Sequence, residues 1–329
     1  MPLKPLAPDM LAPDALLYGA NLTTSMAWAP GQPLPAPGDC VWYHLCAINI
    51  ATRAWLEASQ RMSSTTIDAM LAEDTRPRVL IKPDGVLINV RAINTYCPTH
   101  PEQMVSLRIW TDGDVVLTCR RDDNQAVEQL REHITQRRGP LTAGGLVVAL
   151  MREVYEEIEY YIDELERCVA ELELHVNADD ALQRPPHNIS DVRRKIALYR
   201  RYIFPQAKLL NDLSQASIGW LSDRQRADII EQHDRVLRYT EELNDIRDRA
   251  EILYEEIKYQ QGAELNKTTY LFSIAATIFL PLSFLTGLLG INVGGIPGAA
   301  VDFAFWIFVV LCVMVVGAQI VYFRRKKWF

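Results

Sequence analysis

The residues best suited to chemistry lie in a glycine-rich segment, Gly290–Gly298, which interrupts a long apolar stretch near the C-terminus. Its one polar side chain is that of Asn292. An uncharged amide oxygen can hold the water shell of a divalent cation without trapping the ion. Asparagine and glycine are also common where helices end, so an ordinary helix C-cap is the alternative interpretation. We therefore take Asn292 as a candidate contact for a hydrated metal ion.

The apolar segment before this loop carries a stripe of small or weakly polar side chains. On a helix they fall within about 80° of one another. Such a stripe suits the lining of an aqueous path, and it equally suits close helix packing in lipid. Nearby, Pro281 lacks the N–H that would bond the carbonyl of Thr277, which leaves a backbone acceptor for a neighbouring helix or for water. The candidate pore-lining residues are Thr269, Ser273, Ala276, Leu280, Ser283 and Gly287.

Two groups elsewhere have the residue types of a metal site. Cys40, His44 and Cys46 would share one face of a strand, and thiols with an imidazole suit zinc. Buried core positions explain these three residues equally well. Cys97 and His100 form a weaker pair in a turn.

Two apolar segments position the glycine-rich loop, at about Thr268–Leu289 and Phe303–Phe323. Each has about 20 residues, enough to cross a hydrocarbon core of about 30 Å. Lys267 precedes the first segment and a basic cluster follows the second, whereas the loop between them has no basic residue. The positive-inside rule therefore predicts a membrane hairpin with both termini in the cytoplasm. The basic cluster is Arg324, Arg325, Lys326 and Lys327.

The rest of the chain is acidic. The 329 residues include 34 Lys and Arg and 41 Asp and Glu. Without Lys267, Asp302 and the four terminal basic residues, 29 basic residues face 40 acidic ones, a net charge of −11. Such a surface repels phosphate backbones, so we expect no nucleic-acid partner. The carboxylates crowded between Glu153 and Glu173 would gather cations weakly, or form a plain solvated helix face.

The first 140 residues predict a lead-in followed by a mixed α/β domain. Residues 1–37 hold eight of the eighteen prolines and read as an irregular, partly extended lead-in. Within 38–140, the pair Asp112-Gly113 predicts a hairpin turn between the last two strands. Helices are expected near Ile67–Ala72 and Asn124–Gln136. The predicted strands are Cys40–Ile50, Val79–Lys82, Val86–Ile93, Met104–Trp110 and Val115–Arg120.

Long helices are predicted from residue 141 onward. Apolar residues between Val154 and Val176 recur at steps of three and four, as in a coiled coil. A second helix begins at Asn188 or Ser190 and ends near Ala216. The sequence 222–225 has the form of a capping box, and no strong breaker follows, so one helix is expected from about 222 to 290. Residues 141–267 are thus long cytoplasmic helices including a stalk, and 268–329 a transmembrane hairpin with a basic C-terminus.

The position of Gly290-Ile291-Asn292, directly after a first span with one more span before a basic end, resembles the CorA superfamily of divalent-cation transporters. Further matches are similar to its zinc-transporting branch, the ZntB proteins. Members of the magnesium-type branch usually have acidic residues after the Gly-x-Asn motif, and the loop here has none before Asp302. The further matches are Thr75-Arg76-Pro77-Arg78, Trp220-Leu221-Ser222-Asp223, Phe279-Leu280-Pro281, Phe284-Leu285-Thr286-Gly287, Gly294-Gly295-Ile296-Pro297-Gly298 and Lys327-Trp328.

The resemblance implies a homopentamer with a funnel-shaped cytoplasmic domain. In that arrangement the long helix continues as the pore-lining first span. Gly290, Ile291 and Asn292 then form a candidate selectivity loop, with Asn292 as a ring at the outer entrance. The basic cluster Arg324–Lys327 forms a collar at the inner face. The implied function is transport of Zn²⁺ across the bacterial inner membrane, with proton-coupled uptake. No cofactor is expected, since Zn²⁺ is the cargo. The implied partners are other copies of the chain, the lipid bilayer and divalent cations.

Two other interpretations remain open. A Mg²⁺, Co²⁺ or Ni²⁺ channel of the CorA type belongs to the same class, whereas a membrane-anchored sensor or scaffold belongs to a different one. An enzyme is not expected, because no catalytic triad order, zinc-protease motif or phosphate-binding loop occurs in the sequence.

Overall fold

The computed structural model describes residues 15–28, 38–73, 75–97, 99–177, 187–290 and 303–325. The chain forms two compact units, which divide between Tyr254 and Glu255. Each unit is described by itself below.

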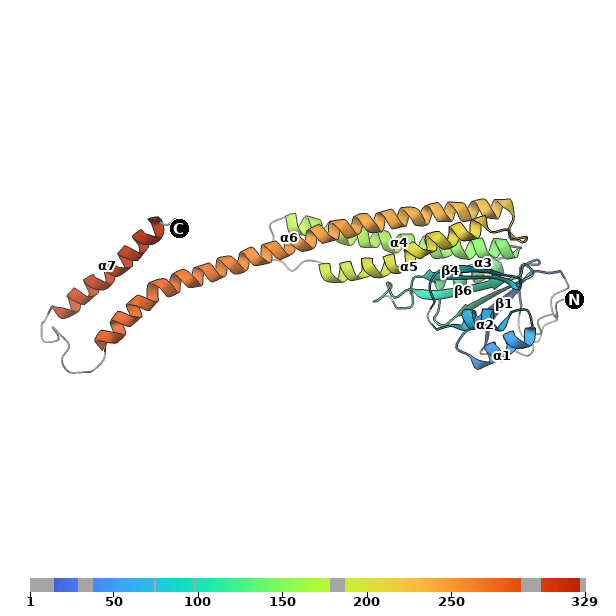
Figure 1. Ribbon diagram of the computed structural model, residues 1–329, viewed down its shortest axis with the longest axis horizontal. Helices are drawn as coiled ribbons and strands as arrows, with labels where there is room; N and C mark the ends of the chain where they lie inside the picture. Colours follow the sequence, from blue (N-terminus) through green and yellow to red (C-terminus); the bar gives the residue numbers. More distant parts are fainter. Residues whose placement is uncertain are drawn as a thin grey trace. The chain divides into compact units, whose positions relative to one another are not determined.

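The first unit contains a seven-stranded sheet in the order β2-β1-β3-β7-β6-β5-β4 (Figure 1). β3 and β7 run parallel and the other neighbours are antiparallel. Asp112 and Gly113 form the predicted turn between β6 and β7, where Gly113 has a φ of +107° and the Asp112 carboxylate accepts from the backbone N–H of Val115. The strands are β1 Leu16–Asn21, β2 Met26–Trp28, β3 Val41–Cys46, β4 Arg78–Lys82, β5 Gly85–Ala92, β6 Val105–Thr111 and β7 Val115–Arg120.

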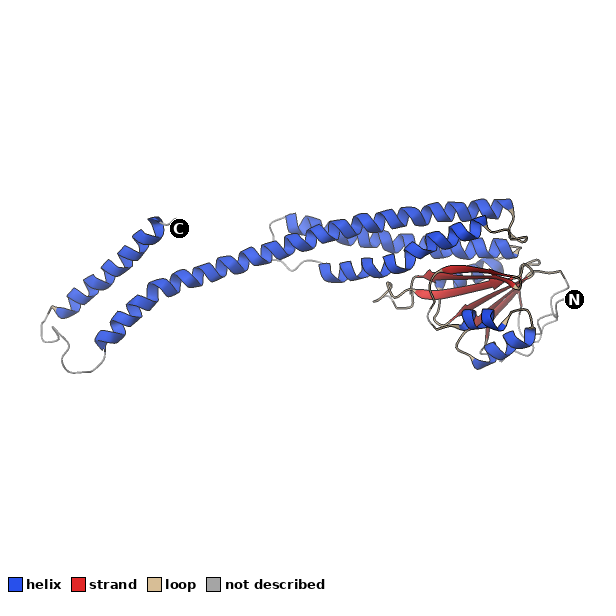
Figure 2. Ribbon diagram, viewed as in Figure 1, coloured by secondary structure: helices blue, strands red, loops and turns tan. Residues whose placement is uncertain are grey.

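Helices cover both faces of this sheet (Figure 2). On one face α1 (Ile50–Ser59) and α2 (Ser64–Leu71) bury apolar side chains against β3, β6 and β7. On the other face lie α3 (Gln125–Thr135), α4 (Ala143–Asn177) and α5 (Ile189–Gln215). The amide of Gln206 on α5 exchanges two hydrogen bonds with the backbone of Arg91 on β5, at 3.2 and 3.4 Å. The sheet is therefore fixed to the long helices by a buried polar contact as well as by packing.

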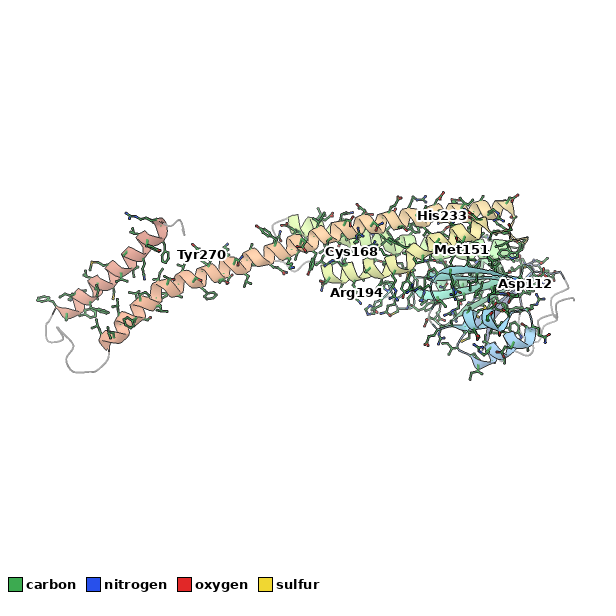
Figure 3. All side chains as sticks on the ribbon, in the orientation of Figure 1. Asp112, Met151, Cys168, Arg194, His233 and Tyr270 are labelled. Atoms are coloured by element: carbon green, nitrogen blue, oxygen red, sulfur yellow. The ribbon has the colours of Figure 1, made fainter. Side chains whose placement is uncertain are left out.

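The long helix α6 (Asp223–Gly290) begins in the first unit and ends in the second. Its start is the predicted capping box, because the Ser222 hydroxyl accepts from the N–H of Gln225 and the Gln225 side chain accepts from the N–H of Ser222. Apolar residues that recur on α6 at steps of three, four or seven are buried against α4 and α5, and Cys168 lies on the α4 side of this bundle (Figure 3). Those buried positions on α6 are Ile229, Val236, Tyr239, Leu243, Ile246, Ala250 and Leu253.

The second unit contains the end of α6 and the helix α7 (Ala304–Arg325). Both helices are long and apolar enough to cross a membrane. Of the side chains described here, Ile274 on α6 and Phe323 on α7 are the most buried. The two predicted apolar segments are thus confirmed as helices.

Two expectations about the first unit were wrong. The lead-in is not irregular throughout, since residues 16–21 and 26–28 form β1 and β2 at one edge of the sheet. The strand expected over Cys40–Ile50 ends at Cys46, and Asn49 caps the helix α1, which was not expected. Proline density concealed the first two strands, and a capping asparagine ended the apolar run of the third.

Candidate functional site

The predicted pore-lining stripe lies on an exposed face of α6. The more buried positions of this segment recur with a helical spacing: Ile274, Ala275, Ile278, Pro281, Leu282 and Leu285. At 100° per residue their centre lies about 175° around the helix from the centre of the stripe. The stripe therefore faces away from the side of α6 that is buried in the hairpin. All six predicted residues are exposed in the single chain: Thr269, Ser273, Ala276, Leu280, Ser283 and Gly287.

Hydroxyl groups on and beside the stripe are satisfied within α6. Ser273 donates to the carbonyl of Thr269 at 2.9 Å, and Thr277 donates to the carbonyl of Ser273 at 2.7 Å. Thr286 donates to the carbonyl of Leu282 at 3.0 Å. These oxygens keep free lone pairs, which suits contact with water. These three hydroxyl groups can therefore face either water or another helix without leaving a donor unpaired.

The acceptor that Pro281 exposes has a partner on the other helix. The side-chain amide of Gln319 on α7 donates to the carbonyl oxygen of Thr277 at 3.1 Å. The sequence indicated a free acceptor at Thr277 but did not identify its partner. A signal was present, since Gln319 is the one amide side chain in the second apolar segment.

The candidate selectivity loop and the basic collar are described only at their edges. Gly290 is the last residue of α6 and is exposed, whereas Ile291 and Asn292 lie outside the described residues. Arg324 and Arg325 are exposed at the end of α7, and Lys326 and Lys327 lie outside the described residues. The roles proposed for these residues therefore rest on the sequence.

The thiols and imidazole of Cys40, His44 and Cys46 do not form a metal site. His44 is fully buried between strands, with Nδ1 2.7 Å from the hydroxyl of Thr118, and burial lowers its pKa to about 3. Burial raises the pKa of the Cys40 thiol to about 12, which disfavours the thiolate that zinc needs. Across the described ranges, no three His, Cys, Asp or Glu side chains come together as metal ligands. The core interpretation of these residues therefore fits better than the zinc interpretation.

Most carboxylates on the acidic face of α4 have partners. Arg249 on α6 binds Glu173 through two nitrogens, each at 2.8 Å, and contacts Glu166 at 3.3 Å. The hydroxyl of Tyr239 on α6 donates to Glu159 at 2.8 Å. This face is therefore in part an interface with α6, rather than a free surface for cations.

Glu157 differs from these partnered carboxylates because it is buried. Both of its carboxylate oxygens are buried without a hydrogen-bond partner, beside a cavity of about 310 Å³. Burial, together with the nearby charge of Glu153, raises the pKa of Glu157 to about 7. The sequence did not single this residue out from its acidic neighbours. The cavity is lined by Thr95, Gln125, Gln129, Glu153, Glu156, Glu157, Tyr160 and Tyr161.

Comparison with known proteins places this arrangement in a family. Residues 37–325 match the family described as CorA-like Mg²⁺ transporter protein. The zinc transport protein ZntB of Pectobacterium carotovorum is 31% identical over 290 residues, 87% of each chain. The divalent cation transporter CmaX of Pseudomonas aeruginosa is 34% identical over 293 residues, 89% of this chain and 88% of CmaX.

Comparison of the fold with solved structures identifies the same family. The structure of a full-length CmaX protein matches with a TM-score of 0.81 and 33% identity, and the match covers 96% of this chain and 98% of that one. The α/β domain, the long helix and the two apolar C-terminal helices are thus shared with a solved relative. The chain belongs to the CorA-like family of transporters.

Proposed function

We propose that this chain transports Zn²⁺ across the bacterial inner membrane, through a pore formed by five copies, with both termini in the cytoplasm. Uptake is coupled to protons in this proposal. The observation that carries conduction is the exposed stripe on α6, which faces away from the buried side of the hairpin. The choice of Zn²⁺ is supported by the similarity to ZntB and by the absence of acidic residues between Asn292 and Asp302.

A pore needs several copies because two helices cannot enclose an aqueous path. When several α6 helices surround an axis, their stripes supply hydroxyl oxygens and open space at Gly287. Hydrated cations can pass such a surface, since it offers weak oxygen contacts and no fixed charge that would hold them. Asn292 would form a ring of amide oxygens at the outer entrance. Arg324 and Arg325 would lie with the remaining collar residues at the inner face.

Protons have no carrier within the two predicted spans, because neither contains a carboxylate or an imidazole. In the proposed mechanism, protons therefore move with water in the pore or bind at groups in the cytoplasmic part. Glu157 is a group of the second kind, since its pKa lies close to neutral pH.

A broader divalent-cation transporter is the second candidate. The similarity to CmaX favours it, since that relative is described as a divalent cation transporter and its identity to this chain is 34%. The two candidates differ in selectivity and share the same pore.

The test is Zn²⁺ flux into proteoliposomes that hold the purified protein, read with an internal Zn²⁺-sensitive dye. Wild type and Asn292→Ala are compared with and without an inward proton gradient. We expect Zn²⁺ uptake by wild type to rise with the proton gradient. In Asn292→Ala we expect uptake to fall at least about tenfold, because each ion would lose its contact with the amide oxygens at the entrance. Asn21→Ala, far along the sequence in β1, serves as the matched asparagine control.

The other outcomes separate the alternatives. Flux of Mg²⁺, Co²⁺ or Ni²⁺ without flux of Zn²⁺ would assign the protein to the channel candidate. Zn²⁺ flux that is indifferent to the gradient would remove proton coupling. Absence of flux for every metal would leave a membrane-anchored sensor or scaffold.

A further inference from the structure

The membrane hairpin contains a break in its backbone hydrogen bonding. Pro281 has no N–H, so the carbonyl of Thr277 loses the partner that an α-helix would normally supply. The hydroxyl of Thr277 does not repair this loss, because it donates one turn back to the carbonyl of Ser273. In a hydrocarbon environment an unpaired carbonyl costs several kcal/mol, so such an acceptor needs a donor.

Gln319 supplies that donor from the other helix. Its Nε2 lies 3.1 Å from the carbonyl oxygen of Thr277. Ile274, one turn before Thr277, and Phe323, one turn after Gln319, are the most buried side chains of their helices in this unit. The polar contact and the two buried apolar side chains thus lie on neighbouring turns of an antiparallel pair. Together they form one contact region between α6 and α7.

A glutamine at this position is costly unless it has a specific task. Its Oε1 is buried and has no hydrogen-bond partner. An apolar side chain would avoid both the desolvation of the amide and this unpaired oxygen. The contact that offsets the cost is the one to the Thr277 carbonyl, which exists as a free acceptor because residue 281 is proline.

We propose that Gln319 is a positioning residue for transport, and that its amide replaces the N–H missing at Pro281. By holding α7 at this turn, it fixes the direction of the α6 segment beyond Pro281. That segment carries Ser283 and Gly287 of the stripe and ends at Gly290. This inference rests on the proposed transport function, but the contact itself can be tested without it.

A double-mutant cycle on the full-length protein tests the proposal. Gln319→Met removes the amide and keeps an unbranched side chain of similar length. Pro281→Ala returns an N–H to the Thr277 carbonyl, so Gln319 is no longer needed there. Val313→Met places the same side chain at an exposed position of α7 and serves as the control. Both the Tm in detergent and the Zn²⁺ flux in proteoliposomes are measured for each variant.

In the Pro281 background we expect Gln319→Met to lower the Tm by about 2–5 °C and to lower the flux about 3- to 15-fold, as for an interhelical hydrogen bond. In the Pro281→Ala background both effects should fall below about 1 °C and 1.5-fold. Val313→Met should change neither quantity in either background. A purely structural role of the glutamine would make the Tm depend in this way on the residue at position 281, but not the flux.

Three results would overturn the proposal or part of it. Equal losses in both backgrounds would show that Gln319 does not replace the proline N–H. Coupling in the Tm without coupling in the flux would remove the positioning role in transport. If wild type carries no flux of any metal, the proposed function fails, whereas the Tm cycle still decides whether the Gln319 contact exists.

Discussion

Burial decides the charge state of several side chains in the first unit. His44 is held neutral in the folded state, because burial lowers its pKa from 6.5 to about 3. Folding stability that depends on the neutral form is therefore present above pH 6.5 and is lost as the pH falls toward 3. The same desolvation keeps the thiols of Cys40 and Cys119 protonated, with pKa values raised to about 12. These residues act as core groups, not as metal ligands.

The pKa of Glu157 is shifted in the opposite direction from that of His44, and this shift gives a prediction near neutral pH. Its folded pKa of about 7 lies above the unfolded value of 4.5, so the folded state holds the proton more tightly. The stabilising contribution is present below pH 4.5 and is lost as the pH rises through 7. At pH 8, Glu157→Gln should therefore raise the free energy of unfolding by about 1–3 kcal/mol, seen as a higher Tm than that of wild type. At pH 4.5 the substitution should leave the Tm nearly unchanged.

The measurement is the Tm of the detergent-solubilised protein between pH 4.5 and 8. Glu164→Gln, an exposed position on the same helix, is the control for loss of a carboxylate. A Tm difference between Glu157→Gln and wild type that stays constant over this range would contradict the assignment.

Gly113 gives a second prediction for a single residue. Its φ of +107° is a conformation that other residues rarely adopt, and an added Cβ would lie 3.0 Å from the Trp220 side chain. Gly113→Ala should therefore destabilise the protein by about 1–3 kcal/mol, seen as a lower Tm. Gly219→Ala, where an added Cβ meets nothing within 4 Å and φ is not positive, should change the Tm little. Equal effects at the two glycines would refute this argument.

Among the elements, α4 and α6 are joined by one well-formed ion pair. Arg249 presents a planar fork to Glu173, and lysine cannot reproduce that geometry. Arg249→Lys should lower the free energy of unfolding by about 1 kcal/mol, as measured by chemical denaturation or the Tm. Arg247→Lys is the matched control, because Arg247 pairs with its neighbour Asp248 on the same helix and joins no elements. A loss no larger than that of the control would mean that the pair does not hold α6 against α4.

Elements with strong periodic patterns were predictable from the sequence, and contacts between distant residues were not. The capping box identified the start of α6, and the Asp-Gly pair identified the β6–β7 turn. The strand β1 was missed because its alternation is short and lies among prolines. The Gln319–Thr277 contact joins residues 42 positions apart, so sequence showed the free acceptor without its donor. Glu157 looks like its acidic neighbours in sequence, and only packing distinguishes it.

For the whole molecule, the proposed function requires that copies of α6 meet along the stripe. Gly287→Leu would fill the space that the stripe leaves there, so Zn²⁺ flux should fall at least about tenfold while the oligomer remains intact. Phe279→Leu, exposed on α6 but outside the stripe, should keep most of the flux. Native mass spectrometry should give five copies of the 37.4 kDa chain for both variants. Loss of flux in Phe279→Leu alone would place the pore on another face.

The single parallel pair in the sheet has a consequence for synthesis. β3 pairs with β7, so Val41 cannot pair until Val115, roughly 70 residues later in the chain, has been synthesised. At 5–20 residues per second, the nascent chain carries β3 for about 4 to 14 seconds before its partner leaves the ribosome. During that interval β3, paired only with β1, has an open edge, which is prone to wrong pairing. Early ribosome-bound chains of this protein should therefore be clients of chaperones that cover such edges.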